Sequence, residues 1–170
     1  PSPVLALFEQ PVRLSEFQSD TGLILLLDRI QDPGNMGTLL RSALWYGVEH
    51  IGFVKGCVDA FNPKVVQASM GALAHLQCVE RSAEEWVEWS ASNGRRLLVA
   101  DMDGTPAAEM NWTSKDILVL GNEGQGCDVA FKAVGNKVTL PGNTAKMESL
   151  NVAISGATLL YAYATASSEL

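Results

Sequence analysis

Three polar segments of this sequence carry residue types that could orient a ligand, and each includes or follows an apolar stretch. They are residues 28–41, 118–126 and 140–153. The third places Ser149 and Asn151 just before a long run of small residues that predicts a helix. The first N–H groups of a helix are unpaired and carry partial positive charge, so a polar opening there can orient a ligand. Taken alone these two side chains would be ordinary helix caps, but three such segments in one small domain predict a single site.

The second segment contains a glycine-rich stretch at residues 121–126, Gly-Asn-Glu-Gly-Gln-Gly. Glycines that follow a strand let the backbone approach a ligand closely. The spacing GxxGxG is neither the dinucleotide-binding GxGxxG nor a P-loop, and no Lys-Ser/Thr pair follows it. The stretch therefore gives little support for a phosphate cradle, and Glu123 between the glycines favours a cationic or hydroxyl-bearing ligand. A simple turn is the alternative interpretation.

The first segment predicts a turn followed by a helix. Pro33 and Gly34 would form the turn, and Asn35 is placed to cap the helix. Arg41 then lies on the second helical turn, with Thr38 one turn earlier on roughly the same face. The local pattern by itself also describes a capped helix with a surface arginine.

The elements that must position these segments alternate between strand and helix along the chain. Apolar runs predict strands at residues 23–27, 51–54, 75–79, 97–100, 117–120 and 137–140. Helices are predicted at residues 37–46, 63–73, 83–92 and 150–166. This alternation predicts an α/β domain with a mainly parallel sheet and helices on both faces. Ligands bind beyond the carboxyl ends of such strands, and the three segments follow Leu27, Leu120 and Leu140 there.

Length and composition predict one globular domain. The chain has 170 residues, 47% of them hydrophobic and 18% charged, which suffices for one core and not for two ordinary domains. We expect residues 1–22 to be an extension or linker remnant and residues 23–170 to form the domain. No run of about 18 apolar residues occurs, which argues against a membrane span. The N-terminus lacks the basic flank and cleavage site of a signal peptide.

The net charge and the cysteine content limit which binding partners and which cellular compartment the sequence predicts. Twelve basic and nineteen acidic side chains give a net charge of −7. This charge argues against a broad, non-specific nucleic-acid surface but allows a local basic site or a separate basic domain. Cys57, Cys78 and Cys127 are odd in number and lack CxxC spacing, so the sequence predicts neither a disulfide scaffold nor a zinc site. A reducing cytoplasm is the predicted location.

Taken together, the three segments in this order and spacing resemble the SpoU-type RNA ribose methyltransferases of the SPOUT superfamily. The first matches that family's Asn, Gly and Arg after an Asp-Pro turn, and the second its Gly-x-Glu-Gly-x-Gly loop. The third matches the family's Pro followed by Ser-Leu-Asn-Val. The resemblance covers about residues 23–165, which is nearly the whole chain.

The resemblance implies a deep C-terminal trefoil knot that forms a pocket for S-adenosylmethionine (AdoMet). Such threading is an exception to the usual rule of unknotted connections, and periodicity alone does not predict it. By family likeness, the backbone near Gly121, Leu140 and Leu150 would hold the cofactor, and the turn containing Ala100 and Met102 would border the same pocket. The family also implies a homodimer whose active site draws on both subunits.

The implied reaction is methyl transfer to a ribose 2′-hydroxyl of RNA, with ribosomal RNA as the preferred substrate and transfer RNA as the alternative. A sulfonium is already a strong electrophile, so the enzyme must align the hydroxyl and assist loss of its proton. By family likeness, Arg41 is tied to activation of the hydroxyl. Asn35, Glu123, Ser149 and Asn151 would complete the network around it, and no metal is required.

Two other classes of function remain as alternatives. A non-catalytic RNA-binding protein could keep the same fold, although joint retention of Arg41, Glu123 and Asn151 argues against it. A Rossmann-like nucleotide-dependent enzyme is disfavoured because GxGxxG is absent. Because the chain is acidic and lacks an initiator Met, we expect that a preceding basic RNA-recognition domain is missing from it.

Overall fold

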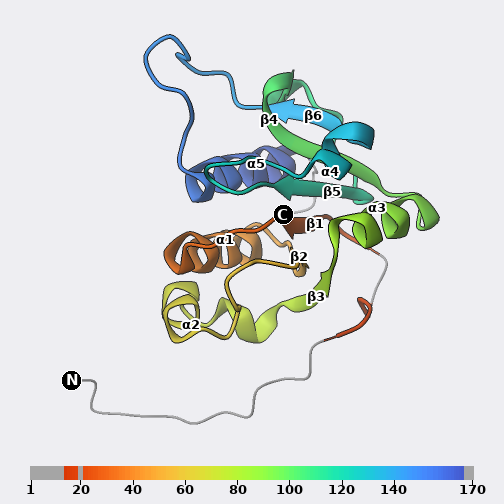
Figure 1. Ribbon diagram of the computed structural model, residues 1–170, viewed down its shortest axis with the longest axis vertical. Helices are drawn as coiled ribbons and strands as arrows, with labels where there is room; N and C mark the ends of the chain where they lie inside the picture. Colours follow the sequence, from red (N-terminus) through yellow and green to blue (C-terminus); the bar gives the residue numbers. More distant parts are fainter. Residues whose placement is uncertain (1–13, 19–20, 167–170) are drawn as a thin grey trace.

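The computed structural model describes residues 14–18 and 21–166. Within them, six parallel strands form one sheet in the order β3-β2-β1-β5-β4-β6, with helices on both faces (Figure 1). The strands are β1 (Ile24–Leu27), β2 (His50–Val54), β3 (Gln77–Arg81), β4 (Arg96–Pro106), β5 (Asp116–Leu120) and β6 (Asn136–Thr139). The helices are α1 (Pro33–Trp45), α2 (Pro63–Ser69), α3 (Ala83–Ser92), α4 (Val129–Val134) and α5 (Val152–Ala166), with short 3-10 helices η1 (Ala72–His75) and η2 (Ala107–Glu109). The predicted α/β class with a parallel sheet is confirmed.

The central strands are apolar on both faces because helices cover both. Side chains alternate along a strand, so Leu25 and Leu27 pack with the core that includes α1, α2 and α5. Ile24 and Leu26 pack on the other face with Trp86 of α3 and with α4. Figure 1 shows this division, with α1, α2 and α5 on one side of the sheet and α3 and α4 on the other. Burial of both faces of the sheet therefore explains the continuous apolar run that was predicted as a buried strand.

Helix α1 begins earlier than predicted, and its cap is Asp32 rather than Asn35. Pro33 fixes the backbone of the first helical residue, and the carboxylate of Asp32 accepts a hydrogen bond from the Asn35 N–H at 2.7 Å. The prediction that Asn35 caps the helix, and that the helix starts at residue 37, was wrong. The side chain of Asn35 is consequently available for other contacts.

Helix α5 begins at Val152, two residues later than the predicted start at residue 150, and Asn151 is its cap. The side-chain oxygen of Asn151 accepts hydrogen bonds from the N–H groups of Ala153 at 2.9 Å and Ile154 at 3.3 Å. Both helices next to the site therefore begin with a side chain that satisfies their first N–H groups.

Several elements differ from the predictions, and β4 runs from Arg96 to Pro106 rather than ending at residue 100, with a register shift between Ala100 and Thr105. Helix α2 ends at Ser69 rather than at residue 73, because Met70 and Gly71 adopt left-handed backbone with φ of 52° and 89°. His75 belongs to η1, so β3 begins at Gln77. Helix α4 was not predicted, since six residues are too few to show a helical period. The predicted domain boundary after residue 22 stays a prediction, because residues 1–13, 19 and 20 lie outside the described ranges.

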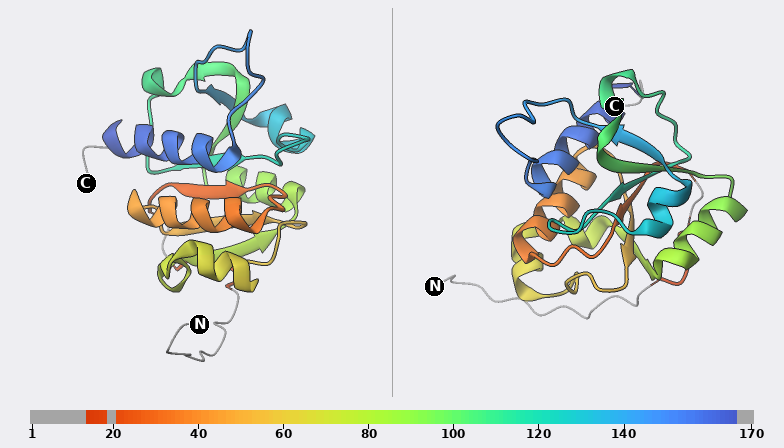
Figure 2. Two further views of the ribbon diagram at one scale, coloured as in Figure 1. Left: turned by 90° about the vertical axis from the view of Figure 1, so that its left-hand side faces the viewer. Right: turned by 45° about the horizontal axis from the view of Figure 1, so that its top comes forward.

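Helix α5 returns to pack against α1 and the carboxyl end of β5. A Cβ at Gly156 of α5 would lie 2.3 Å from Leu39 Cδ2 and 2.6 Å from Leu120 Cδ1, so a glycine is needed for this approach. Figure 2 shows α5 beside α1, with the loop of residues 140–151 projecting from the body. Among the described helices, none is long and apolar enough to cross a membrane.

Candidate functional site

A cavity of about 760 Å³ lies beyond the carboxyl ends of β5 and β6 and beside the middle of β4. Its walls come from these strands, the glycine-rich loop after β5 and the loop between β6 and α5. All residues predicted to border the cofactor line this one cavity: Ala100, Met102, Gly121, Leu140 and Leu150. Its position agrees with the rule that α/β sheets bind ligands beyond the carboxyl ends of their strands.

The glycine-rich loop folds back tightly on the end of β5. The side-chain oxygen of Asn122 accepts hydrogen bonds from the N–H groups of Gly124 at 2.9 Å and Gln125 at 3.0 Å. The N–H of Gly126 donates to the Asn122 carbonyl at 2.8 Å. A Cβ at Gly121 would lie 2.2 Å from the Cys127 nitrogen, so this turn leaves no room for a side chain there.

The three polar segments meet through a chain of side-chain hydrogen bonds. Asn35 Nδ2 donates to Glu123 Oε1 at 2.8 Å, and Asn151 Nδ2 donates to Asn35 Oδ1 at 3.0 Å. Because Asn151 also accepts from the first N–H groups of α5, each amide has one consistent orientation. This series of hydrogen bonds joins α1, the glycine-rich loop and the start of α5 at the cavity. These contacts bring together three of the predicted catalytic residues.

Ser149 and Arg41 occupy different positions. Ser149 is exposed on the cavity wall beside Leu150. Arg41 is exposed on α1, where it lines a separate cavity of about 410 Å³ with Trp45, Met70 and His75. Six residues separate Arg41 from Asn35 in sequence, which is about 9 Å along a helix axis. A single chain therefore does not bring Arg41 into the larger cavity.

The rim of the cavity carries charges that sequence reasoning did not assign to it. Lys132 and Asp101 both line the cavity, and Lys137 Nζ lies 3.3 Å from Asp101 Oδ2. Burial by itself would raise the pKa of Asp101, but the Asp103 N–H and the Lys137 ammonium stabilise the carboxylate and lower the pKa overall. Asp101 therefore stays ionised at neutral pH, and the rim presents both signs of charge to a ligand.

The Cys127 thiol is in the cavity wall but is not a nucleophile. It is buried, its Sγ lies 3.7 Å from the carbonyl oxygens of Ala100 and Val119, and burial raises its pKa to about 12. A thiol with this pKa is protonated at neutral pH, and only the thiolate is a good nucleophile. Cys127 is therefore a packing residue.

We expect the free energy of unfolding to fall as the pH rises above about 9. Burial raises the pKa of Cys57 to about 11 and that of Cys127 to about 12, from 9.0 for an unperturbed thiol. The stabilisation is fully present below the thiol pKa of the unfolded chain. It is lost as the pH rises, because the unfolded chain releases protons that the folded chain retains. Each thiol contributes a slope of up to about 1.4 kcal/mol per pH unit.

Urea unfolding under reducing conditions at about pH 8 and about pH 10 measures this slope. Because lysines and tyrosines also titrate at high pH, the comparison is between the unaltered chain and the variant Cys127→Ala. The variant should lose less stability between the two pH values. Equal losses would contradict the assignment.

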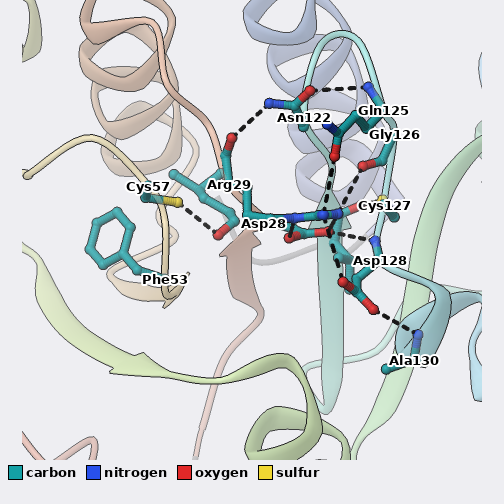
Figure 3. Close-up of polar contacts among 12 residues, drawn as sticks. Asp28, Arg29, Phe53, Cys57, Asn122, Gln125, Gly126, Cys127, Asp128 and Ala130 are labelled. Carbon is teal, nitrogen blue, oxygen red and sulfur yellow. Dashed lines mark hydrogen bonds and ion pairs between the residues drawn. The ribbon is translucent and has the colours of Figure 1, made fainter.

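Sequence reasoning missed a network of polar contacts under the glycine-rich loop (Figure 3). Asp28, fully buried directly after β1, binds the side chain of Arg29 and the backbone of Asp128. The one available signal was a carboxylate at the end of a strand that is otherwise buried and apolar. Nowhere in the described ranges do three or more His, Cys, Asp or Glu side chains group as metal ligands.

The pattern of motifs and the cavity agree with a match to a known family. Residues 22–161 match the model of the SpoU rRNA Methylase family. The chain belongs to this family. The resemblance to SpoU-type methyltransferases inferred from the three segments is thereby confirmed.

Relatives of this SpoU-family chain include named RNA methyltransferases. It is 33% identical over 139 residues to the 23S rRNA (guanosine(2553)-2'-O)-methyltransferase RlmP of Bacillus subtilis, a match that covers 81% of this chain and 56% of that protein. It is 35% identical over 123 residues to human mitochondrial rRNA methyltransferase 3, covering 68% of this chain and 29% of that protein. The chain thus spans about half the length of the Bacillus relative.

Solved structures of SpoU-family proteins share the fold. A TrmH-family RNA methyltransferase from Porphyromonas gingivalis superposes with a TM-score of 0.79 at 40% identity, over 88% of this chain and 61% of that one. The SpoU methyltransferase AviRb from Streptomyces viridochromogenes, crystallised with AdoMet, gives a TM-score of 0.80 at 27% identity. That match covers 92% of this chain and 63% of AviRb.

Proposed function

We propose that this chain is the catalytic domain of an AdoMet-dependent methyltransferase that modifies a ribose 2′-hydroxyl of RNA. One observation carries the proposal: Glu123, Asn35 and Asn151 bring all three motif segments to the mouth of one cavity. Ribosomal RNA is the substrate we favour, because both relatives described above are named rRNA methyltransferases. Transfer RNA is the second candidate.

The residues of the cavity fit AdoMet. The volume of about 760 Å³ lies in the usual range for small-molecule sites. Leu140, Leu150 and Ala100 offer apolar surface to an adenine, while Glu123 and Lys132 offer charges to the sulfonium or ammonium and to the carboxylate of the cofactor. When bound, AdoMet supplies an electrophilic methyl group. The absence of a side chain at Gly121 lets the backbone of Gly126 and Cys127 pack directly against the turn that forms this part of the wall.

In this proposal, the polar side chains align the ribose and stabilise the charge that develops on its oxygen. Bound AdoMet would supply the methyl group to the ribose oxygen and would leave as the neutral thioether S-adenosylhomocysteine, and the hydroxyl proton would pass to solvent water. A guanidinium carries a fixed positive charge, so Arg41 acts by stabilising the forming alkoxide and by contacting RNA phosphate rather than as a simple base. Asn35 holds Glu123 in position, and Ser149 faces the same opening.

Because Arg41 lies outside the larger cavity of its own chain, we propose a homodimer in which α1 of one copy faces the cavity of the other. Apolar side chains on α1 and α5 support this arrangement: Trp45 is 79% exposed and Tyr161 is 55% exposed. The Tyr46 and Tyr161 rings, 6.1 Å apart, join the two helices into one continuous surface. An exposed apolar patch of this kind is typical of a protein interface.

Two further features belong to the proposal. We propose that the chain forms the trefoil knot of its family, with the segment after β6 passing through a loop before α5 packs on α1; family membership supports this. We also propose a cytoplasmic location. The described residues include three cysteines, Cys57, Cys78 and Cys127, and no disulfide joins any two of them, which suits a reducing compartment.

The first experiment is calorimetric titration with AdoMet and S-adenosylhomocysteine, with NAD as the control ligand. We expect saturable binding of the first two and none of NAD. Transfer of labelled methyl groups is then measured on unmodified ribosomal and transfer RNA, and 2′-O-methylation is mapped by resistance of the adjacent phosphodiester to alkali. A folded chain that binds no AdoMet would contradict the cofactor assignment. AdoMet binding without transfer by the full-length protein would favour the non-catalytic alternative.

A further inference from the structure

Two residues that follow β1 form the base on which the glycine-rich loop rests (Figure 3). The Asp28 side chain is fully buried, and its backbone N–H donates to the Leu120 carbonyl at 2.8 Å. Its carboxylate accepts hydrogen bonds from Arg29 Nε at 2.7 Å and Nη2 at 3.1 Å, and from the Asp128 N–H at 2.6 Å. This buried carboxylate therefore has charge-assisted partners, which burial of a charge requires.

The Arg29 guanidinium continues from Asp28 to the far end of the loop. Its Nη2 donates to the Gly126 carbonyl and its Nη1 to Gln125 Oε1, both at 3.4 Å, and Nη1 lies 3.7 Å from Asp128 Oδ2. The hydrogen bond to Asp28 raises the pKa of Arg29, with smaller contributions from the charges of Asp28 and Asp128, so the guanidinium stays charged. The side chain thus contacts the last residues of the loop.

The backbone of Arg29 holds the near end of the same loop. Its carbonyl accepts a hydrogen bond from Asn122 Nδ2 at 3.0 Å, and the other end of the Asn122 amide organises the turn. Arg29 has a φ of 56°, a left-handed conformation that is unfavourable for a side chain other than Gly, Asn or Asp. If only the turn mattered, Gly or Asn would adopt it at lower cost, so the contacts of the guanidinium are the reason for an arginine here.

We propose that Arg29 is a positioning residue for the cofactor pocket, because it holds both ends of the loop whose residues line the cavity. Asn122, Gly126 and Cys127 are in the cavity wall, whereas Asp28 and Arg29 are behind it. Since Glu123 is held independently by Asn35, loss of Arg29 should affect AdoMet binding more than the chemical step. The identity of the ligand, AdoMet, rests on the proposed function. The positioning role itself rests only on the contacts between Arg29 and the loop.

A matched control pair lies at the opposite ends of the strands, where β4 and β5 begin. Arg96 donates to both carboxylate oxygens of fully buried Asp116 at 2.8 Å, and these residues begin β4 and β5. The cavity lies toward the other ends of these strands. Replacing Arg96 breaks an arginine–carboxylate ion pair of the same kind away from the cavity. The variant therefore controls for a general loss of stability.

The test compares Arg29→Asn, Arg29→Lys and Arg96→Asn in the full chain. Asparagine tolerates the left-handed conformation, so Arg29→Asn removes the guanidinium without adding backbone strain. We expect both asparagine variants to lower the melting temperature. Only Arg29→Asn should raise the Kd and KM for AdoMet, by about tenfold or more, with kcat at saturating cofactor within about threefold. Lysine keeps the charge without the planar fork, so Arg29→Lys should recover part of the affinity.

Unchanged AdoMet affinity in Arg29→Asn, or an equal loss in Arg96→Asn, would overturn the proposal. Hydrogen exchange provides a readout that does not depend on the cofactor. In Arg29→Asn the amides of residues 121–128 should exchange at least about fivefold faster than in Arg96→Asn. If the unaltered chain binds no AdoMet but this difference appears, the proposed function fails and the positioning role stands. If the exchange rates are equal, the positioning role fails.

Discussion

Replacing Arg41 with alanine is expected to slow methyl transfer to RNA by about 100- to 1000-fold while changing AdoMet affinity by less than about twofold. Arg41 is exposed on α1 and does not line the 760 Å³ cavity of its own chain, so we expect its side chain to contribute little to cofactor binding. Its fixed charge is available to the forming alkoxide and to RNA phosphate, and both interactions are lost with the guanidinium. Single-turnover transfer at saturating AdoMet and calorimetric titration measure the two effects separately.

The matched control for Arg41→Ala is Lys64→Ala. Lys64 is an exposed cation on the neighbouring helix α2 and lines neither cavity described above. The variant Lys64→Ala also removes one positive charge, so a loss of methyl transfer shared by the two variants reflects general electrostatic attraction of RNA. Normal methylation by Arg41→Ala would refute the catalytic assignment. A parallel loss of AdoMet binding would instead mean that Arg41 acts through the cofactor pocket.

Replacing Gly121 with alanine is expected to weaken AdoMet binding by about 100-fold and to lower the free energy of unfolding by about 1–3 kcal/mol. The new Cβ would lie 2.2 Å from the Cys127 nitrogen and 2.3 Å from the Gly126 carbonyl carbon. Both are backbone atoms, so the turn must open rather than a side chain rotate. Opening the turn displaces the cavity wall. Calorimetric titration and urea unfolding measure the two effects.

Gly124→Ala is the control within the same loop. A Cβ at Gly124 would meet only Asn122 Oδ1 at 3.6 Å, an ordinary contact, and Gly124 does not line the cavity. This variant should bind AdoMet and unfold like the unaltered chain. If Gly121→Ala and Gly124→Ala behave alike, the close packing of the turn on Cys127 is not what shapes the pocket.

The sheet could be predicted from sequence because its strands are buried on both faces. Runs such as residues 23–27 and 117–120 have no polar alternation, which distinguishes them from surface strands. Helix boundaries were harder to predict, because they depend on single capping interactions. Asp32 and Asn35 are both good capping residues, and the observed cap is Asp32, directly before Pro33 in the first helical turn.

The residues that the family resemblance placed at the cofactor line one cavity, which agrees with the meeting of the carboxyl ends of parallel strands at one edge of the sheet; their binding of the cofactor stays a prediction. Two features could not be predicted this way. The position of Arg41 outside that cavity depends on the direction in which α1 presents it. The partners of Arg29, at Asn122 and Gly126, are more than ninety residues away in sequence, and no local pattern links them.

The sheet order has a consequence for how the chain folds. Strand β1 forms pairs with β2 on one side and with β5 on the other, where Ile24 is matched to Ile117. Such distant pairings must overcome a large loss of chain entropy, so we infer slow folding compared with helical proteins of this size. Until β5 arrives, an apolar edge of β1 stays exposed to other chains. The cavity is formed by β4, β5, β6 and α5, so a ligand there stabilises only the completed fold.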